Sequence, residues 1–340
     1  MGYAVMQPRP ACQGAGGPVT RPRSRASSPG QGKDAGVKVG VIGLGSMGMG
    51  AALSLAHAGH AVSGCELREA AWTELQAAGG TCTGTPGGLP DGMDALVVFV
   101  VNAAQAEAAL FGAKEGEPGA LERVAPGGVV LCCTTMAPEA ARTTAVRVEA
   151  AGRLYLDAPV SGGSVGARAG SMTVMGSGSP AAFDRAAPVL DAMAGKVWRL
   201  GDAAGAGSTV KMVNQLLAGV HIAAAGEAMA LAIRAGADPQ TVYDVITGSA
   251  GNSWMFQNRV PHILAGDDTP HSSVNIFVKD LGIVLDQARA YAFPLPMAAS
   301  AHQLFLAAAA AGHGARDDAF VIRVWENLAG ITLPKGANDA

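Results

Sequence analysis

The sequence contains few aromatic and few charged residues. Phe, Trp and Tyr together make up 5% of the 340 residues, and Asp, Glu, Lys and Arg make up 15%, with a net charge of −3. A chain without excess positive charge lacks the electrostatic footprint of a nucleic-acid-binding protein. With 49% hydrophobic residues, so little charge favours helices that are extensively buried, between subunits as well as within one. We therefore expect no nucleic-acid partner.

Cysteine is scarce too, and the five cysteines do not follow the spacing of a metal site. Cys65, Cys132 and Cys133 fall inside strand-like apolar runs, where cysteine packs as a small hydrophobic residue. This usage fits a reduced compartment. We predict a cytoplasmic protein without a metal ion.

The sequence shows neither a secretory signal nor a membrane span. Residues 1–36 are rich in Gly, Pro and Arg and have no apolar core. An organellar transit peptide is one interpretation, but Pro and Gly disfavour the amphipathic helix of such a peptide, so we favour a disordered extension. The most apolar stretch, 216–233, contains Glu227 and is predicted to be a buried helix rather than a membrane span.

Strand-like and helix-like segments alternate from residue 37 to residue 200, which is typical of an α/β domain with a doubly wound, mainly parallel sheet. From 201 to 335 only helices are expected, so we place a domain boundary near residue 200. The predicted strands are 37–42, 61–65, 94–101, 128–133, 153–157, 171–175 and 196–200, and the predicted helices are 46–58, 68–78, 138–150, 181–194, 208–235, 239–247, 277–292, 296–311 and 319–329.

A glycine-rich motif follows the first predicted strand and opens the first helix. Gly43-Leu44-Gly45-Ser46-Met47-Gly48 has the G-x-G-x-x-G spacing. The first glycine permits a tight turn, the second lets a pyrophosphate approach the backbone, and the third lets helix and strand pack closely. The other interpretation, a glycine-rich turn without a ligand, is disfavoured by the strand–turn–helix context. We predict a Rossmann domain over 37–200 that binds a dinucleotide.

Glu66 ends the second predicted strand, 18 residues beyond Gly48. An acidic residue at this place binds the ribose 2′-hydroxyl of NAD, and its charge repels the 2′-phosphate of NADP. Arg68, two residues further on, either offsets this charge in part or is a solvated surface arginine. We predict NAD as the cofactor, with NADP disfavoured.

A second glycine-containing loop follows the strand that ends at Asp157. In Asp157-Ala-Pro-Val-Ser161-Gly162-Gly163, a hydroxyl and two glycine N–H groups lie at the carboxyl edge of the sheet, where doubly wound folds bind ligands. Together they form a plausible nest for a small carboxylate. A Ser-Gly-Gly sequence is also common in turns that bind nothing.

Lys211 is the only formally charged side chain between Asp202 and Glu227, in a chain with 7 lysines and 17 arginines. In an apolar helix, desolvation disfavours the charged form of a lysine and makes it a usable base near neutral pH. The alternative is that Lys211 extends from the first helical turns into solvent.

Four motifs, in order, resemble those of the β-hydroxyacid dehydrogenase family, which includes 3-hydroxyisobutyrate, tartronate semialdehyde and L-threonate dehydrogenases. The resemblance covers roughly residues 37–330. It implies a Rossmann domain joined by a long helix to an all-helical domain, an active site in the cleft between them, and a homodimer or homotetramer. The motifs are Gly43-Leu-Gly-Ser-Met-Gly48, Asp157-Ala-Pro-Val-Ser-Gly-Gly163, Gly207-x-x-x-Lys211-x-x-Asn214-Gln215 and Phe277-Val-Lys279-Asp280-Leu281.

The resemblance also implies roles for single residues. Lys211 is similar to the catalytic lysine of the family, and Lys279 to the lysine that closes over the cofactor near the nicotinamide. Asn102 stands where the family often has proline. By the same resemblance, Ser161, Gly162 and Gly163 bind the substrate carboxylate, Asn214 and Gln215 hold the lysine and the substrate, and Val101, Asn102 and Thr135 border the cofactor.

Within the family, the sequence is most similar to the L-threonate dehydrogenase branch, in residues 40–50, 64–65, 101–105 and 275–281. This implies oxidation of L-threonate to 2-dehydro-L-erythronate, with Lys211 as general acid and base. A 3-hydroxyisobutyrate dehydrogenase or a 2-hydroxy-3-oxopropionate (tartronate semialdehyde) reductase is the alternative within the family. A non-catalytic dinucleotide-binding scaffold and an imine reductase are alternatives of other classes. Both are disfavoured because such relatives lack the lysine.

Overall fold

The computed structural model describes residues 36–114 and 116–333, which form two compact units. The first contains the described residues up to Thr134 together with Pro138–Ser208, and the second contains Thr135–Ala137 and the chain from Thr209 onwards. The disordered extension expected over 1–36 lies, apart from Gly36, outside the described residues.

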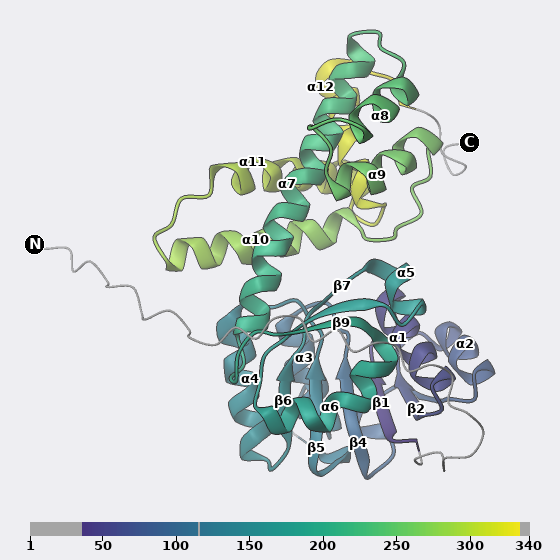
Figure 1. Ribbon diagram of the computed structural model, residues 1–340, viewed down its shortest axis with the longest axis vertical. Helices are drawn as coiled ribbons and strands as arrows, with labels where there is room; N and C mark the ends of the chain where they lie inside the picture. Colours follow the sequence, from purple (N-terminus) through teal and green to yellow (C-terminus); the bar gives the residue numbers. More distant parts are fainter. Residues whose placement is uncertain (1–35, 115, 334–340) are drawn as a thin grey trace, which may run out of the picture. The chain divides into compact units, whose positions relative to one another are not determined.

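The first unit is built on a six-stranded parallel sheet with the order β3-β2-β1-β4-β5-β6 (Figure 1). The strand order reverses between β1 and β4, which is the switch point where folds of this kind bind ligands. The predicted doubly wound sheet is therefore confirmed. Its strands are β1 (Lys38–Ile42), β2 (Ala61–Cys65), β3 (Thr81–Thr83), β4 (Met93–Val98), β5 (Val124–Cys132) and β6 (Leu154–Asp157).

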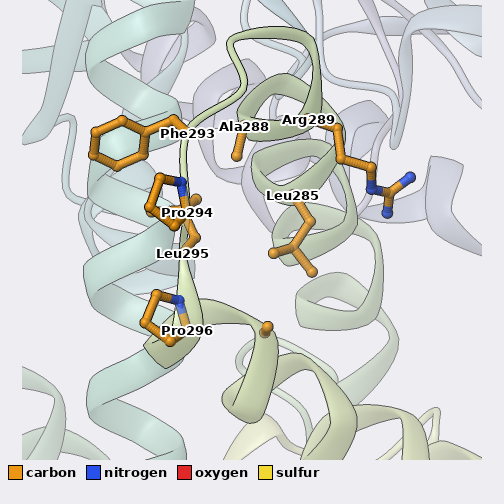
Figure 2. Close-up of a pocket in the computed structure, with 8 residues that line it drawn as sticks. Leu285, Ala288, Arg289, Phe293, Pro294, Leu295 and Pro296 are labelled. Atoms are coloured by element: carbon orange, nitrogen blue, oxygen red, sulfur yellow. The ribbon is translucent and has the colours of Figure 1, made fainter.

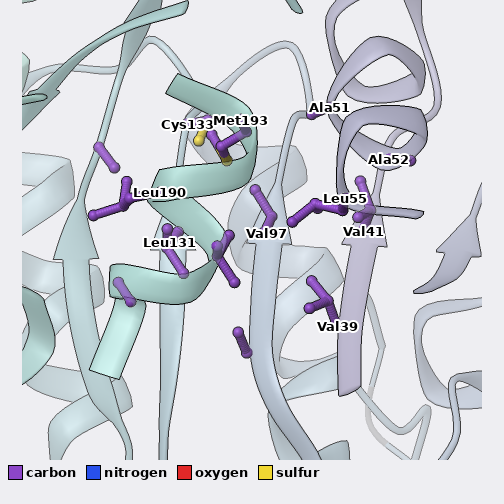
Figure 3. Packing of buried hydrophobic residues seen from close by; sticks show 14 of the residues in the cluster. Val39, Val41, Ala51, Ala52, Leu55, Val97, Leu131, Cys133, Leu190 and Met193 are labelled. Carbon is purple, nitrogen blue, oxygen red and sulfur yellow. The ribbon is translucent and has the colours of Figure 1, made fainter. Parts of the chain in front are cut away.

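Helices cover both faces of this sheet, because right-handed crossovers place connections that run in opposite directions along the sheet on opposite faces. One face packs against α1 (Ser46–His57) and α6 (Pro180–Met193), as Figure 3 shows. The alternate strand residues that point to this face are apolar and almost fully buried, which accounts for their β-branched and Leu-rich composition. Side chains that meet there include Val39, Val41, Val97 and Leu131 from the strands, Leu55 from α1, and Leu190 and Met193 from α6.

Three further strands form a separate small sheet in the order β7-β8-β9. Within it β7 (Val160–Ser161) is antiparallel to β8 (Met172–Gly176), and β8 is parallel to β9 (Ala194–Arg199). Two of these strands were expected from the sequence, but the alternation of strands and helices does not reveal which sheet a strand joins. The remaining helices of this unit are α2 (Trp72–Ala77), α3 (Ala103–Phe111), α4 (Pro138–Ala150) and α5 (Gly163–Arg168).

The second unit is helical and is organised around α7 (Ala206–Arg234). Within the part of the chain that the structure describes, α7 is the one helix long and apolar enough to cross a membrane by length and composition. Its residues contribute to two hydrophobic clusters of this unit, so α7 is a core helix. It packs with α8 (Pro239–Thr247), α9 (Trp254–Ala265), α10 (Val274–Ala290), α11 (Pro296–Ala308), the 3-10 segment Asp318–Arg323 and α12 (Val324–Ala329).

Helix α9 was not expected from the sequence, in part because Pro261 lies inside it. The Ser253 hydroxyl accepts a hydrogen bond from the Phe256 N–H and so caps its first turn. Tertiary contacts then hold the helix: Arg259 donates to both oxygens of the buried Asp318 carboxylate, and His262 contacts Asp317. Long-range ion pairs of this kind leave no local signal in the sequence.

Candidate functional site

The glycines of the first motif have different structural roles. Gly43 follows β1 with a φ of +86°, and a Cβ on it would lie 2.7 Å from the Phe99 carbonyl oxygen. A Cβ on Gly48 would overlap the Gly43 carbonyl oxygen. Around Gly45, in contrast, no atom lies within 4 Å of the Cβ position. The fold therefore requires Gly43 and Gly48 to be glycine, whereas Gly45 leaves open space at the N-terminus of α1, where we propose that a pyrophosphate binds.

Glu66 lies at the end of β2 and its carboxylate is bound on both oxygens. Oε2 accepts from the Leu44 N–H at 3.1 Å, while Oε1 accepts from the Arg68 N–H and from Arg68 Nε at 3.0 Å. Burial raises the pKa of Glu66, but the hydrogen bonds from Arg68 and Leu44 outweigh it and hold the pKa below its usual range. The carboxylate is thus ionised and fixed beside the glycine loop, with Arg68 directed back toward it.

The loop after β4 contains Val101 and Asn102. Asn102 caps α3: its Oδ1 accepts from the Gln105 N–H, and Gln105 Oε1 accepts in return from the Val101 N–H, each at 2.9 Å. This reciprocal pair gives Asn102 a local structural role at the position where the family often has proline. Thr135 follows β5, is partly buried, and belongs to the short segment that groups with the helical unit.

Ser161, Gly162 and Gly163 form the turn between β7 and α5. Gly162 and Gly163 have φ values of +128° and +62°, so both need the conformational freedom of glycine. Both glycines are exposed, and Ser161 is partly exposed. The turn therefore presents a hydroxyl and backbone to solvent on the first unit, as a carboxylate nest requires.

Lys211 lies in the second unit and is buried rather than extended into solvent, with 8% of its surface exposed. Its Nζ donates to Gln215 Oε1 at 2.7 Å, and the same oxygen accepts from Asn214 Nδ2 at 3.0 Å. Burial lowers the pKa of Lys211 from 10.5 to about 8, while the charge of Asp280 raises it and that of Lys279 lowers it. A lysine in this state readily exchanges a proton near neutral pH.

Asp280 is a buried carboxylate to which sequence reasoning assigned no role. Its Oδ2 accepts from Gln215 Nε2 at 2.5 Å, and its Oδ1 forms an ion pair with Lys279 Nζ at 2.6 Å. Lys211, Gln215, Asp280 and Lys279 are thus connected through one amide and one carboxylate. The motif around Lys279 contained Asp280, but its contact with a residue 65 positions earlier has no signal in a single sequence.

No group of His, Cys, Asp or Glu side chains among the described residues is arranged to hold a metal ion. An open hollow of about 500 Å³ lies where α10 turns into α11, lined by side chains such as Leu285, Arg289 and Phe293 (Figure 2). It contains none of the residues singled out from the sequence, and its lining is mostly apolar.

Family profiles match both parts of the chain. The profile described as the NAD binding domain of 6-phosphogluconate dehydrogenase matches residues 38–201, and the one described as NAD-binding of NADP-dependent 3-hydroxyisobutyrate dehydrogenase matches residues 205–325. Together they cover both the Rossmann unit and the helices that follow it, and both profiles describe dinucleotide-dependent dehydrogenases.

Individual relatives are similar along almost their whole length. L-Threonate dehydrogenase of Cupriavidus necator is 54% identical over 296 residues, which are 87% of this chain and 97% of that protein. The L-threonate dehydrogenase of Escherichia coli K12 is 52% identical over 297 residues, which are 87% of this chain and 96% of that protein. A crystal structure described as 3-hydroxyisobutyrate dehydrogenase from Salmonella typhimurium is 50% identical, with a TM-score of 0.80 over 85% of this chain and 99% of that one.

The two roles of the glycines predict opposite outcomes for the same substitution. Gly45→Ala should leave the melting temperature unchanged, because its Cβ enters open space, but should weaken dinucleotide binding by about tenfold or more, since the pyrophosphate loses its close approach. Gly48→Ala should destabilise the fold itself through overlap with Gly43. Thermal unfolding and calorimetric titration with NAD check both. Intact dinucleotide affinity in Gly45→Ala would contradict this placement of the pyrophosphate.

The connection between Asp280 and Lys211 predicts the direction of a pKa change. Asp280→Asn removes the negative charge that raises the pKa of Lys211. The positive charge of Lys279, which lowers this pKa, remains, so the pKa of Lys211 should fall below about 8. The rate at which acetic anhydride modifies Lys211, followed by mass spectrometry across pH, reports this value. Asp286→Asn, on the exposed side of the same helix, is the matched control and should not change it. A pKa that rises or stays constant in Asp280→Asn would refute the coupling.

Proposed function

The chain belongs to the 3-hydroxyisobutyrate dehydrogenase-like family of β-hydroxyacid dehydrogenases and is an NAD(P)-dependent hydroxyacid dehydrogenase; from this premise we propose that it oxidises L-threonate to 2-dehydro-L-erythronate with NAD. The observation that carries the proposed chemistry is Lys211, which is buried, has a pKa of about 8, and is held by Gln215. The substrate follows the L-threonate dehydrogenases, which are 49–54% identical over 87% of this chain.

In the proposed mechanism, the Ser161 hydroxyl and the backbone of Gly162 and Gly163 bind the substrate carboxylate. Neutral Lys211 accepts the proton of the substrate hydroxyl through Nζ, and in the reverse reaction the protonated lysine returns it. A dinucleotide, when bound, would supply the acceptor for the hydride that leaves the carbon bearing this hydroxyl. Gln215 keeps Nζ in place throughout, and Asn214 fixes the Gln215 amide by donating to its oxygen.

We propose that the remaining site residues bind the dinucleotide. The N–H groups of Ser46 and Met47 and the open space at Gly45 would receive the pyrophosphate at the N-terminus of α1, while the Leu44 N–H stays bound to Glu66 beside it. Val101 and Asn102 would border the cofactor, Thr135 would lie beside the nicotinamide, and Lys279 would close over the cofactor. Because Lys279 is paired with Asp280, this role requires its ammonium group to exchange partners or to serve both.

We propose NAD rather than NADP because of the state of Glu66. Its carboxylate is ionised and fixed, so it can accept from a ribose 2′-hydroxyl and repels a 2′-phosphate. Arg68, the cation that would attract the phosphate, is already paired with Glu66.

Similarity to the Salmonella structure described as 3-hydroxyisobutyrate dehydrogenase supports 3-hydroxyisobutyrate as a second candidate substrate. The 2-hydroxy-3-oxopropionate reductase of Escherichia coli, 32% identical over 87% of this chain, keeps that reaction as a third possibility within the family. We also propose a cytoplasmic homodimer or homotetramer. Large exposed apolar side chains on the helical unit, such as Leu231, Met297 and Leu328, support a subunit interface there.

A panel of hydroxy acids tests the substrate. NADH formation should be fastest with L-threonate when D-erythronate, D-glycerate, 3-hydroxyisobutyrate and L-serine are offered at equal concentration. Activity confined to 3-hydroxyisobutyrate would refute the L-threonate assignment and preserve the family.

Lys211→Met should lower kcat by about 10²–10⁴, because the general base is lost. Its affinity for NAD should stay within about twofold, since the lysine makes no contact in the proposed pyrophosphate site. In the unmodified enzyme the oxidation rate should rise with pH through about 8, as Lys211 loses its proton, and the rate of the reverse reaction should fall over the same range. Lys38→Met, at an exposed lysine of β1, is the control. A Lys211→Met enzyme with full activity would end the proposed mechanism.

Glu66→Gln should shift cofactor preference toward NADP. The change removes the repulsive charge, keeps an oxygen that can accept from the Leu44 N–H, and frees Arg68 to meet a 2′-phosphate. The ratio of kcat/KM for NADP over NAD should rise by about tenfold or more, measured with one hydroxy acid at saturation. Glu69→Gln, at an exposed acid three residues further on, should leave the ratio unchanged. An unchanged ratio in Glu66→Gln would place the origin of cofactor preference elsewhere.

A further inference from the structure

The start of α7 is held by the buried carboxylate of Asp157, the last residue of β6. Asp157 Oδ2 accepts from the backbone N–H groups of Gly205 and Ser208, both at 2.9 Å, and from the Ser177 hydroxyl at 3.1 Å. Its Oδ1 accepts from the Ser208 hydroxyl at 2.7 Å. The Ser177 hydroxyl in turn accepts from the Gly207 N–H at 2.9 Å. One carboxylate and one hydroxyl thus bind N–H groups in the first turn of a helix, which have no partners within the helix itself.

Backbone packing independently fixes the same point. A Cβ on Gly207 would overlap the Met175 carbonyl oxygen and lie 2.9 Å from the Asp157 carbonyl oxygen, so the first turn of α7 lies directly against the ends of β6 and β8. Asp157 and Ser177 also exchange backbone hydrogen bonds of 3.0 and 2.8 Å. Asp157, Ser177 and Ser208 are each at most 1% exposed. These contacts therefore fix both the rotation of the first turn about the helix axis and its position along that axis, relative to β6 and β8.

We propose that Asp157 is a positioning residue for the reaction: its carboxylate fixes the first turn of α7 and thereby sets where Lys211, one turn further along, presents its Nζ. Residues three apart on a helix lie on the same side, so Ser208 and Lys211 are neighbours along one face. Asp157 also ends the strand from which the chain leads, four residues later, to Ser161. The proposal deepens the proposed function and rests on Lys211 being the proton acceptor.

Asp157 acts through the backbone and not on the substrate, so its effect has to be separated from a loss of stability. The expected effect on Lys211 comes from the position of the first turn. A displaced first turn lets water reach Nζ, which favours the protonated lysine and raises its pKa. The charged groups that influence Lys211 directly, Asp280 and Lys279, both come from α10 and stay unchanged in these variants.

The test compares Asp157→Ala, Asp157→Asn, Ser208→Ala and a matched control, Ser54→Ala, in the full chain. Ser54 is a buried serine of α1 whose hydroxyl donates to the Ala167 carbonyl, away from α7. Two quantities are measured: kcat at saturating NAD and hydroxy acid, and the pKa of Lys211 from the pH dependence of its modification by acetic anhydride. The second readout needs no turnover, so it separates failure of this proposal from failure of the proposed function. Thermal unfolding gives the folded fraction at the assay temperature.

In Asp157→Ala we expect kcat to fall by about 10- to 100-fold and the pKa of Lys211 to move from about 8 toward 10.5, because small displacements of a catalytic group have effects of this size. Asp157→Asn should restore most of the activity, because its amide oxygen accepts the same N–H groups and the Ser208 hydroxyl can turn to accept from the amide. Its lysine pKa should be unchanged or slightly lower. Ser208→Ala loses one of the hydrogen bonds, so its kcat and its lysine pKa should lie between those of Asp157→Ala and Asp157→Asn. Ser54→Ala should match the parent enzyme in both quantities.

The proposal is overturned if kcat in the variants follows only the folded fraction while the pKa of Lys211 stays at its parent value. If Asp157→Ala does not fold, Ser208→Ala decides by the same criterion. If the parent protein oxidises none of the hydroxy acids but Asp157→Ala still raises the pKa of Lys211, the positioning role is supported and the proposed function is refuted.

Discussion

The polar interior of the helical unit depends on the burial of Lys211. Its ammonium group has lost most of its water, so it needs an acceptor, and Gln215 supplies one. The amide of Gln215 then needs an acceptor for its own N–H₂ group, which is Asp280, and the charge of Asp280 is balanced by Lys279. Each buried polar group that lost its partner would cost about 1–3 kcal/mol. The four side chains therefore form one hydrogen-bonded network, and a substitution of any one of them affects the others.

Glycine has two separate uses in this fold, and only contacts distinguish them. Gly48 and Gly207 are required because backbone of another segment occupies the place of a side chain, so they fix how a helix meets the sheet. Gly45 has no such neighbour, and its missing side chain leaves space on the surface. The proposed dinucleotide site lies at the beginning of α1 and the proposed proton acceptor near the beginning of α7. The first turns of these helices are fixed by the close backbone packing of Gly48 and Gly207, respectively.

The local and periodic features of the site could be predicted from the sequence. The G-x-G-x-x-G turn, the acidic residue after β2 and the lone charge in an apolar helix each have a physical meaning that a single segment contains. What could not be predicted depends on residues far apart in the chain. Asp280 reaches Gln215 across 65 positions, Asp157 reaches Ser208 across 51, and α9 is held by Asp317 and Asp318. Likewise, alternation predicted strands β8 and β9 but not that they leave the main sheet, since sheet membership is decided by pairing.

The amide of Gln215 has one more consequence. An imidazole or a carboxyl group between Lys211 and Asp280 would relay protons, because such groups gain and lose them near neutral pH. A primary amide neither gains nor loses a proton under these conditions. The charge of Asp280 therefore raises the pKa of Lys211, but Gln215 cannot pass a proton from the lysine to the carboxylate. The proton on Lys211 therefore has no internal route to Asp280 through this contact. In the proposed mechanism, Lys211 therefore exchanges its proton only with a molecule that contacts Nζ directly, which is the substrate hydroxyl.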